Sequence, residues 1–139
     1  MVNLRVLFIA TFVMAVFGNI NHDLINATTR GDLEGVEKSL SSGGNPHWRS
    51  PDNQGSTILH FAAALNHSAI VSSLLNSGAD IEVRDDFRIT PLQYASVVGS
   101  TDSLATLIAH GADVNNQAFN GDTALIAATQ SGHLNIVNT

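Results

Sequence analysis

The sequence predicts an all-α repeat solenoid, in which pairs of short antiparallel helices stack and β-hairpin-like loops project from one edge. Segments that begin at Ser56, Ile89 and Asp122 repeat one pattern at a spacing of 33 residues. The first helix expected in each unit is rich in Ala, and a Gly or Asn interrupts every unit at a matching place. A unit of this size cannot bury its apolar face alone, so a repeat of this length indicates stacked neighbours.

Each unit has signals for where its helices begin and end. The first helix is expected to begin after an aligned threonine, a residue type that caps helix N-termini: Thr57, Thr90 and Thr123. Pro91 suits the first helical position, where its missing N–H is not needed. The break between the two helices is expected at residues that tolerate positive φ: Asn66, Gly99 and Gly132. Gly78 and Gly111 are expected to end the second helices.

The core is predicted from apolar positions that align between units. Ile70, Val71, Leu74 and Leu75 have helical spacing and are expected to face the core. Two further sets of residues align at the repeat spacing. One set is Leu59, Leu92 and Leu125, and the other is Ala62, Ala95 and Ala128. The small alanine side chains allow neighbouring helices to approach closely.

The pattern resembles the ankyrin repeat. The family's T-P-L-H-x-A stretch corresponds to TPLQYA at 90–95 and to TILHFA at 57–62, and its G-A-D-V-N ending is present at 111–115. The resemblance implies an ankyrin domain over residues 19–139, with a divergent unit at about 22–51, repeats at about 52–84 and 85–117, and a partial repeat at 118–139. Terminal repeats normally have a polar outer face that closes the stack, and the last unit here stops at Thr139 without one. We therefore expect a piece of a longer protein; the alternative is a truncated product.

Residues 1–18 are predicted to be a signal peptide. Arg5 is followed by twelve uncharged residues, 6–17, and then by Gly18, which is the layout of a secretory leader. Twelve helical residues span about 18 Å, which is too short for a bilayer. We therefore expect a secreted protein that has no membrane association after cleavage. The alternatives are a retained apolar helix or anchor, and a cytoplasmic protein.

Charge and motifs exclude several classes of function. The formal net charge of −6 disfavours nucleic acid as a partner. The chain has no Cys and none of the G-x-S-x-G, H-E-x-x-H or G-x-x-x-x-G-K-[ST] motifs. The six histidines share no ligand spacing, and His60 and His133 fall at pattern positions of the repeat. We expect a protein that is not an enzyme, with no catalytic residue, metal, cofactor or small-molecule substrate.

The resemblance implies that a protein partner binds to the projecting loops and to the concave helix face. Phe87 and Phe119 are the leading candidates, expected at equivalent loop positions, because exposed aromatic side chains on rigid loops are typical interface anchors. The alternative is that each packs onto a neighbouring loop. Asp85 and Asp86 beside Arg88 would add charge selectivity or form a solvated cluster. The full set of expected contact residues is Gln54, Ser56, Arg84, Asp86, Phe87, Arg88, Ile89, Gln117, Phe119, Asn120 and Asp122.

Three asparagines are candidates for modification or for bridging. Asn66 and Asn26 begin N-x-[ST] sequons, and the interhelical turn makes Asn66 the better candidate for glycosylation in a secreted protein. Asn115 is expected to link adjacent loops by hydrogen bonds. Its context is also similar to ankyrin sites modified by a cytosolic asparaginyl hydroxylase, which would require an intracellular protein.

The sequence leaves three functions open. The first is a secreted, non-catalytic protein-binding module or part of a larger secreted ankyrin protein. The second is an intracellular ankyrin scaffold. The third is a regulatory or chaperone-like ankyrin domain associated with an enzyme that is not in this chain. The fold does not decide among them, because function depends on the site.

Overall fold

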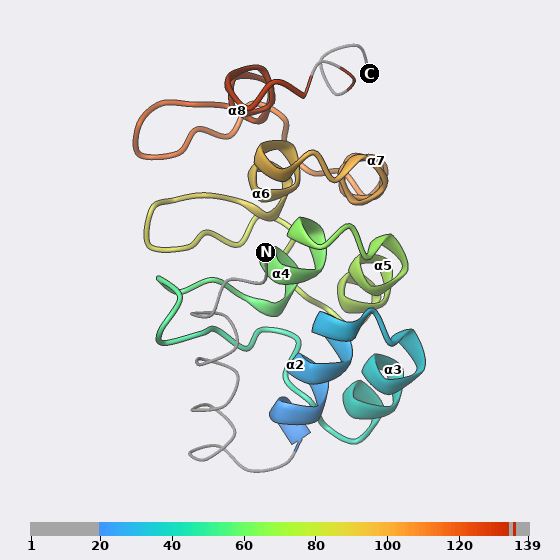
Figure 1. The fold of residues 1–139 in the computed structure, drawn as a ribbon. Coiled ribbons are helices and arrows are strands. Elements are labelled where there is room, and N and C mark those ends of the chain that lie inside the picture. Colours follow the sequence, from blue (N-terminus) through green and yellow to red (C-terminus); the bar gives the residue numbers. More distant parts are fainter. Residues whose placement is uncertain (1–19, 134, 136–139) are drawn as a thin grey trace.

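The computed structural model describes residues 20–133 and 135, and this part of the chain forms two columns of helices (Figure 1). Helices α2, α4, α6 and α8 form the inner column, and α3, α5 and α7 form the outer column. The long loops project from the inner column on the side away from the outer one. The bounds are α2 Ile20–Arg30, α3 Leu33–Ser41, α4 Ile58–Ala64, α5 Ser68–Asn76, α6 Pro91–Val98, α7 Thr101–Ala109 and α8 Ala124–Gln130. The predicted all-α solenoid is confirmed.

The aligned threonines are the N-caps of α4, α6 and α8, as predicted. Thr57, Thr90 and Thr123 all have extended backbone conformations immediately before their helices. At α6 the cap is reciprocal, because the Gln93 backbone N–H donates to Thr90 Oγ1 while the Thr90 N–H donates to Gln93 Oε1 at 2.9 Å. The helix starts therefore follow from local sequence.

The predicted breaks between paired helices are also confirmed. Gly99 and Gly132 have φ values of 85° and 77°, and Asn66 has a φ of 60°. Residues other than Gly and Asn are disfavoured in this left-handed region by roughly 1–2 kcal/mol. The short turns fold α5 back against α4 and α7 back against α6.

The core lies between the two columns and continues through the stack. Ala62, Ala95 and Ala128 are fully buried at the interface of successive inner helices, where the absence of a larger side chain allows close packing. The aligned leucines differ, because Leu59 and Leu92 are 1% and 2% exposed whereas Leu125 is 53% exposed. The same sequence position is therefore core in two units and surface in the unit of α8.

Candidate functional site

Three loops, which we call fingers, project from the inner helices. The first, second and third fingers comprise residues 49–57, 82–90 and 115–123. The second finger is closed by a hydrogen bond from the Asp85 N–H to the Ile89 carbonyl at 3.1 Å, and the third by the corresponding bond from Ala118 to Asp122 at 3.0 Å. These closures hold each tip in one shape. In the first finger, Arg49 and Thr57 form an isolated antiparallel bridge.

Backbone hydrogen bonds join each finger to the next. The Asp86 N–H donates to the Gln54 carbonyl at 2.8 Å, and the Phe119 N–H donates to the Phe87 carbonyl at 3.1 Å. These bonds repeat at 33 residues, and they show that Phe119 aligns with Asp86 while Phe87 aligns with Asn120. The expectation that the two phenylalanines are equivalent is therefore wrong by one residue. The offset places Phe119 directly across from Phe87.

Asp85 organises the second finger from inside. Its carboxylate is buried, and Oδ1 accepts hydrogen bonds from the N–H groups of Phe87 at 2.9 Å and Ile89 at 2.8 Å. The hydroxyl of Tyr94 donates to the other carboxylate oxygen at 2.9 Å, and burial raises the pKa of Tyr94. The expectation that Asp85 adds charge selectivity or is solvated is wrong. The aligned position is Asp52 in the first finger, where it is exposed, and Ala118 in the third, so the repeat pattern does not reveal that Asp85 is buried.

Ser56 is not available as a contact residue. Its side chain is 2% exposed, and its hydroxyl lies 2.9 Å from the Tyr94 hydroxyl. The α6 helix of the following unit covers it, which the finger's own sequence does not reveal. Gln54, at the tip of the same finger, is exposed.

Arg84 joins the second finger to the third. Its guanidinium donates to Asn116 Oδ1 and, at 3.4 Å, to the Gln117 carbonyl. The amide of Asn116 also donates to the Glu82 carboxylate. The loop-bridging role expected for Asn115 therefore belongs to its neighbour, since the Asn115 side chain is exposed. Arg84 is half-buried and stabilises the stack, while Gln117 is exposed.

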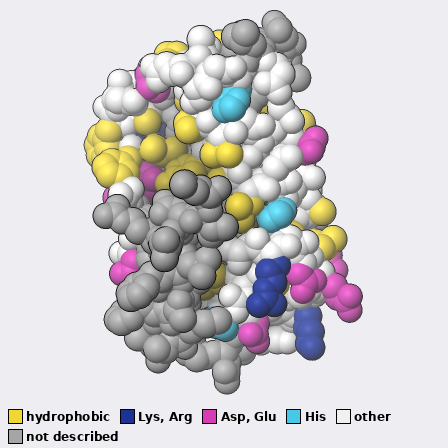
Figure 2. Space-filling model, viewed as in Figure 1, with side chains coloured by type: hydrophobic (Ala, Val, Ile, Leu, Met, Phe, Trp, Pro, Cys, Tyr) yellow, Lys and Arg dark blue, Asp and Glu magenta, His cyan; other side chains and the backbone are white. Residues whose placement is uncertain are grey.

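The two phenylalanines line a groove between the second and third fingers. Phe87 is 47% exposed and Phe119 is 68% exposed. The groove has a volume of about 400 Å³, and hydrophobic side chains gather at this edge of the molecule (Figure 2). We call it the finger groove; it is lined by Phe87, Ile89, Gln93, Val97, Ala118, Phe119, Asn120, Asp122, Ala127, Gln130 and Ser131. Sequence-predicted residues from both fingers thus meet in one place with residues of α6 and α8.

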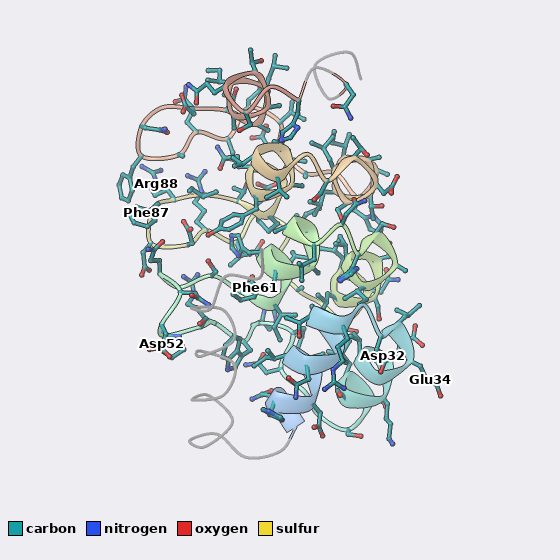
Figure 3. The ribbon with its side chains drawn as sticks, viewed as in Figure 1. Asp32, Glu34, Asp52, Phe61, Phe87 and Arg88 are labelled. Atoms are coloured by element: carbon teal, nitrogen blue, oxygen red, sulfur yellow. The ribbon has the colours of Figure 1, made fainter. Side chains whose placement is uncertain are left out.

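Arg88 stands at the tip of the second finger beside Phe87 (Figure 3). Its guanidinium carbon lies 5.6 Å from the centre of the Phe119 ring, within the range of a cation–π contact. Its φ is 62°, at the position that Gly55 and Gly121 occupy in the neighbouring fingers. A non-glycine residue in this conformation is strained by roughly 1–2 kcal/mol, and such strain is often found at functional sites.

The concave helix face continues the apolar surface away from the fingers. Leu65 at the end of α4 and Val97 and Val98 at the end of α6 are exposed. Val97 also lines the finger groove. Asp86 is exposed as well, but it lies close to Gly55 and Arg49 of the first finger, so it faces the side of the second finger opposite the groove.

His60 is buried and holds two units together. Its Nδ1 accepts from the Thr57 N–H at 3.0 Å, and its Nε2 lies 2.9 Å from the Ile89 carbonyl, so Nε2 carries the proton. Burial lowers the pKa of His60, which keeps the ring neutral. Gln93 makes the equivalent pair of bonds one repeat later, to Thr90 and to the Asp122 carbonyl. His60 is therefore a structural residue.

The remaining histidines do not form a metal centre within the described part of the chain. Residues 20–133 and 135 contain no group of three or more His, Asp or Glu side chains placed to hold an ion. His133 Nε2 lies 3.0 Å from the Val97 carbonyl and links the turn after α8 to α6.

The side chain of Asn66, the better candidate for glycosylation, already makes hydrogen bonds to α7. Asn66 Oδ1 accepts from the backbone N–H groups of Asp102 at 3.1 Å and Ser103 at 3.0 Å, at the start of α7. Its Nδ2 atom, which would carry a glycan, donates to the Asp102 carboxylate at 3.1 Å. Asn26 is half-buried, and its Nδ2 lies 3.1 Å from the ring of His22. Glycosylation at either site would have to displace these contacts.

The predicted signal peptide, residues 1–18, lies outside the described residues. Within the part that the structure does describe, none of the helices has the length and apolar character needed to cross a bilayer.

Comparison with known proteins agrees with the geometry. A family model for ankyrin repeats in three copies matches residues 24–118 and 82–139. The chain belongs to the ankyrin repeat family. This confirms the resemblance predicted from the sequence.

Several relatives share the ankyrin segment. Glycerophosphocholine phosphodiesterase gde1 of Schizosaccharomyces pombe is 34% identical over 104 residues, which are 74% of this chain and 9% of the relative. A transient receptor potential cation channel subfamily A member 1 homolog of Caenorhabditis elegans is 35% identical over 86 residues, 62% of this chain and 7% of the relative. The protein named as 26S proteasome regulatory subunit p28 of Saccharomyces cerevisiae is 29% identical over 136 residues, 90% of this chain and 60% of its own length. The chain thus spans a small part of the first two and about three fifths of the third.

Proposed function

We propose that the chain is a non-catalytic protein-binding module whose partner docks in the finger groove. The observation that supports this proposal is the exposure of Phe87 and Phe119 on two fingers that are locked together by a backbone hydrogen bond. Membership of the ankyrin family supports protein binding in general.

The fingers are already ordered for binding. Asp85 holds the second finger from inside, and Arg84 ties it to the third. Binding to an ordered surface avoids the entropic cost of immobilising a loop, which is a large opposing term in association. Aromatic side chains on such a surface are typical of the residues that contribute most to protein interfaces.

The test compares variants of the groove with a matched surface control. A partner recovered by crosslinking to the full chain is titrated against the wild-type protein, the F87A/F119A variant and the I108A variant. Ile108 is also exposed but lies on the outer helix α7. We expect F87A/F119A to weaken binding by about 2 kcal/mol or more, with little change in thermal stability, and I108A to bind normally. Unchanged binding by the double variant, or a large loss of its stability, would contradict the proposal.

We further propose that the protein is secreted, on the basis of the leader at residues 1–18. Expression of the full sequence in a eukaryotic host followed by mass spectrometry of the medium tests this directly. Protein that begins at residue 19 in the medium is the expected result. Full-length protein confined to the cells would favour the cytoplasmic alternative. The same spectra report whether Asn26 or Asn66 carries a glycan.

A second candidate is an ankyrin segment that regulates a larger protein. The relatives support it, because several are much longer than the matched region, as in the phosphodiesterase and the channel homolog. A transcript that joins this sequence to a further domain would favour this candidate, and the finger groove would then be tested for binding to that domain.

A further inference from the structure

The finger groove contains one charged lining residue among apolar and neutral polar ones. Phe87, Phe119, Ile89 and Val97 supply its larger apolar side chains, and Asp122 supplies the carboxylate. Asp122 is half-buried, and its carboxylate accepts a hydrogen bond from the Asn120 side chain at 2.6 Å. No ion pair joins it to a Lys, Arg or His of the described residues. A half-buried carboxylate that has no cationic partner favours the binding of a cationic ligand, because the two opposite charges attract.

The charge beside the groove is mixed, because Asp122 lines it and the Arg88 guanidinium lies over the Phe119 ring, whereas the part of the chain that follows Arg88 is acidic. The sequence from residue 89 to residue 139 contains Asp102, Asp113 and Asp122 and no Lys or Arg. Arg88 is the last cationic residue of the chain apart from histidine, and its guanidinium lies over Phe119. That contact shows that the ring accepts a guanidinium on its face. The net charge of −6 also favours a basic partner and disfavours an acidic one.

We infer that the finger groove receives a lysine or arginine side chain from a basic segment of the partner protein. The aliphatic stem of that side chain packs against Phe87 and Val97, and its cation meets the Asp122 carboxylate and the Phe119 ring. This inference rests on the proposed protein-binding function and adds the chemistry of the anchoring residue.

The size of the groove agrees with this occupant. Ligand pockets usually have volumes of about 300–1,000 Å³, so a groove of about 400 Å³ suits one long side chain and its immediate neighbours. Lys and Arg bury an apolar stem while their charged heads contact polar groups. A cation on an aromatic face is stabilised electrostatically, and more strongly the further it is desolvated.

The first experiment uses two small probes with the full 139-residue chain. Nα-acetyl-arginine methylamide and its neutral citrulline analogue are titrated separately, and the backbone amide signals are followed by NMR. We expect the arginine probe to shift the signals of Phe87, Phe119 and Asp122 saturably, and the citrulline probe to leave them unchanged. Equal shifts with both probes, or no saturable shift with arginine, would overturn the inference.

Two variants test the roles of the individual charges. D122N keeps the size of the side chain and one oxygen that can accept the hydrogen bond from Asn120 but removes the negative charge, so we expect it to abolish the arginine-dependent shifts. R88G restores the glycine found at this position in the neighbouring fingers and removes the cation beside the groove, so it should tighten binding of the arginine probe. Shifts that persist in D122N, or weaker binding by R88G, would contradict the basic-anchor inference.

The partner itself separates this inference from the proposed function. D122N should weaken partner binding by about tenfold, which corresponds to about 1.4 kcal/mol. Binding that is lost in F87A/F119A but unchanged in D122N would refute the basic anchor and leave the protein-binding function in place. Binding that is unchanged in F87A/F119A would refute the groove as the binding site, whatever the probes do.

Discussion

Replacement of His60 by glutamine is expected to preserve the fold at neutral pH and to reduce the loss of stability at acidic pH. His60 has no exposed surface, and its two ring nitrogens satisfy the Thr57 N–H and the Ile89 carbonyl. Gln93 makes the same two kinds of bond in the following repeat through its side-chain oxygen and nitrogen. A glutamine at position 60 can therefore make both bonds without a titrating ring.

The magnitude at neutral pH follows from the partners that each variant leaves unsatisfied. H60A leaves one buried donor and one buried acceptor unpaired, at about 1–3 kcal/mol each. It also loses the edge-on ring contact with Tyr94, whose centroid is 4.9 Å away, and such contacts contribute about 0.5–1.5 kcal/mol. H60Q loses mainly the ring contact. We therefore expect H60A to lower the free energy of unfolding by roughly 2.5–7.5 kcal/mol, and H60Q by no more than roughly 1.5 kcal/mol.

The sign of the pH effect follows from the lowered pKa of His60. Desolvation by burial is the main cause of this lowering. The Ile89 carbonyl and the Asp85 charge raise the pKa and offset part of the effect, while the charge of Arg49 lowers it further. Between the folded-state pKa and the unfolded value of about 6.5, the unfolded chain binds more protons at this residue. The free energy of unfolding therefore decreases as the pH falls through this window, by up to about 1.4 kcal/mol per pH unit.

The assay is urea denaturation of the wild type, H60Q and H60A at about pH 7.5 and about pH 5.5, on either side of the ordinary histidine pKa. We expect the wild type to lose more free energy of unfolding between the two pH values than H60Q does. The other histidines titrate in both proteins, so the difference reports on His60. Superimposable pH profiles for the wild type and H60Q would refute the argument, as would H60Q being destabilised as much as H60A at neutral pH.

Two further predictions concern the stack. L92A should lower the free energy of unfolding by about 2–5 kcal/mol, and L125A, at the aligned but exposed position, by less than about 1 kcal/mol; equal effects in denaturant titrations would show that the two sites are equally buried. N66G keeps the positive φ but removes the contacts to α7, so it should cost about 1 kcal/mol, and N66A should cost about 1–2 kcal/mol more because alanine is strained there. Calorimetric melting of the three proteins checks this order, which would be disproved if N66G were as stable as the wild type.

The expected contact residues divide according to which neighbours they meet. Phe87, Phe119, Ile89, Asn120 and Asp122 come together in the finger groove. Gln54 and Gln117 are exposed elsewhere on the fingers. Arg88 stands over Phe119. Whether a partner uses these residues stays a prediction.

Local sequence was sufficient for the features that depend on backbone conformation or on the repeat period. Thr57 and Thr90 cap helices because hydrogen bonds form locally between the backbone and side chain of the threonine and those of the residue three positions later. Gly99 breaks the chain because its φ of 85° is accessible to glycine. The family follows from the same period, since residues that recur every 33 positions must stack on their own copies.

Tertiary structure alone decided which side chains are exposed. Ser56 is covered by Tyr94 of the following unit, and the hydroxyl of the same Tyr94, on α6, also meets the buried Asp85 carboxylate. Leu92 and Leu125 occupy the same position of the repeat, yet only the second is exposed. Burial depends on contacts with elements far away in the sequence, and the sequence of one finger does not indicate which side chains of the next unit will pack against it. The repeat pattern therefore determined the architecture, while the packing of successive units determined where a partner can bind.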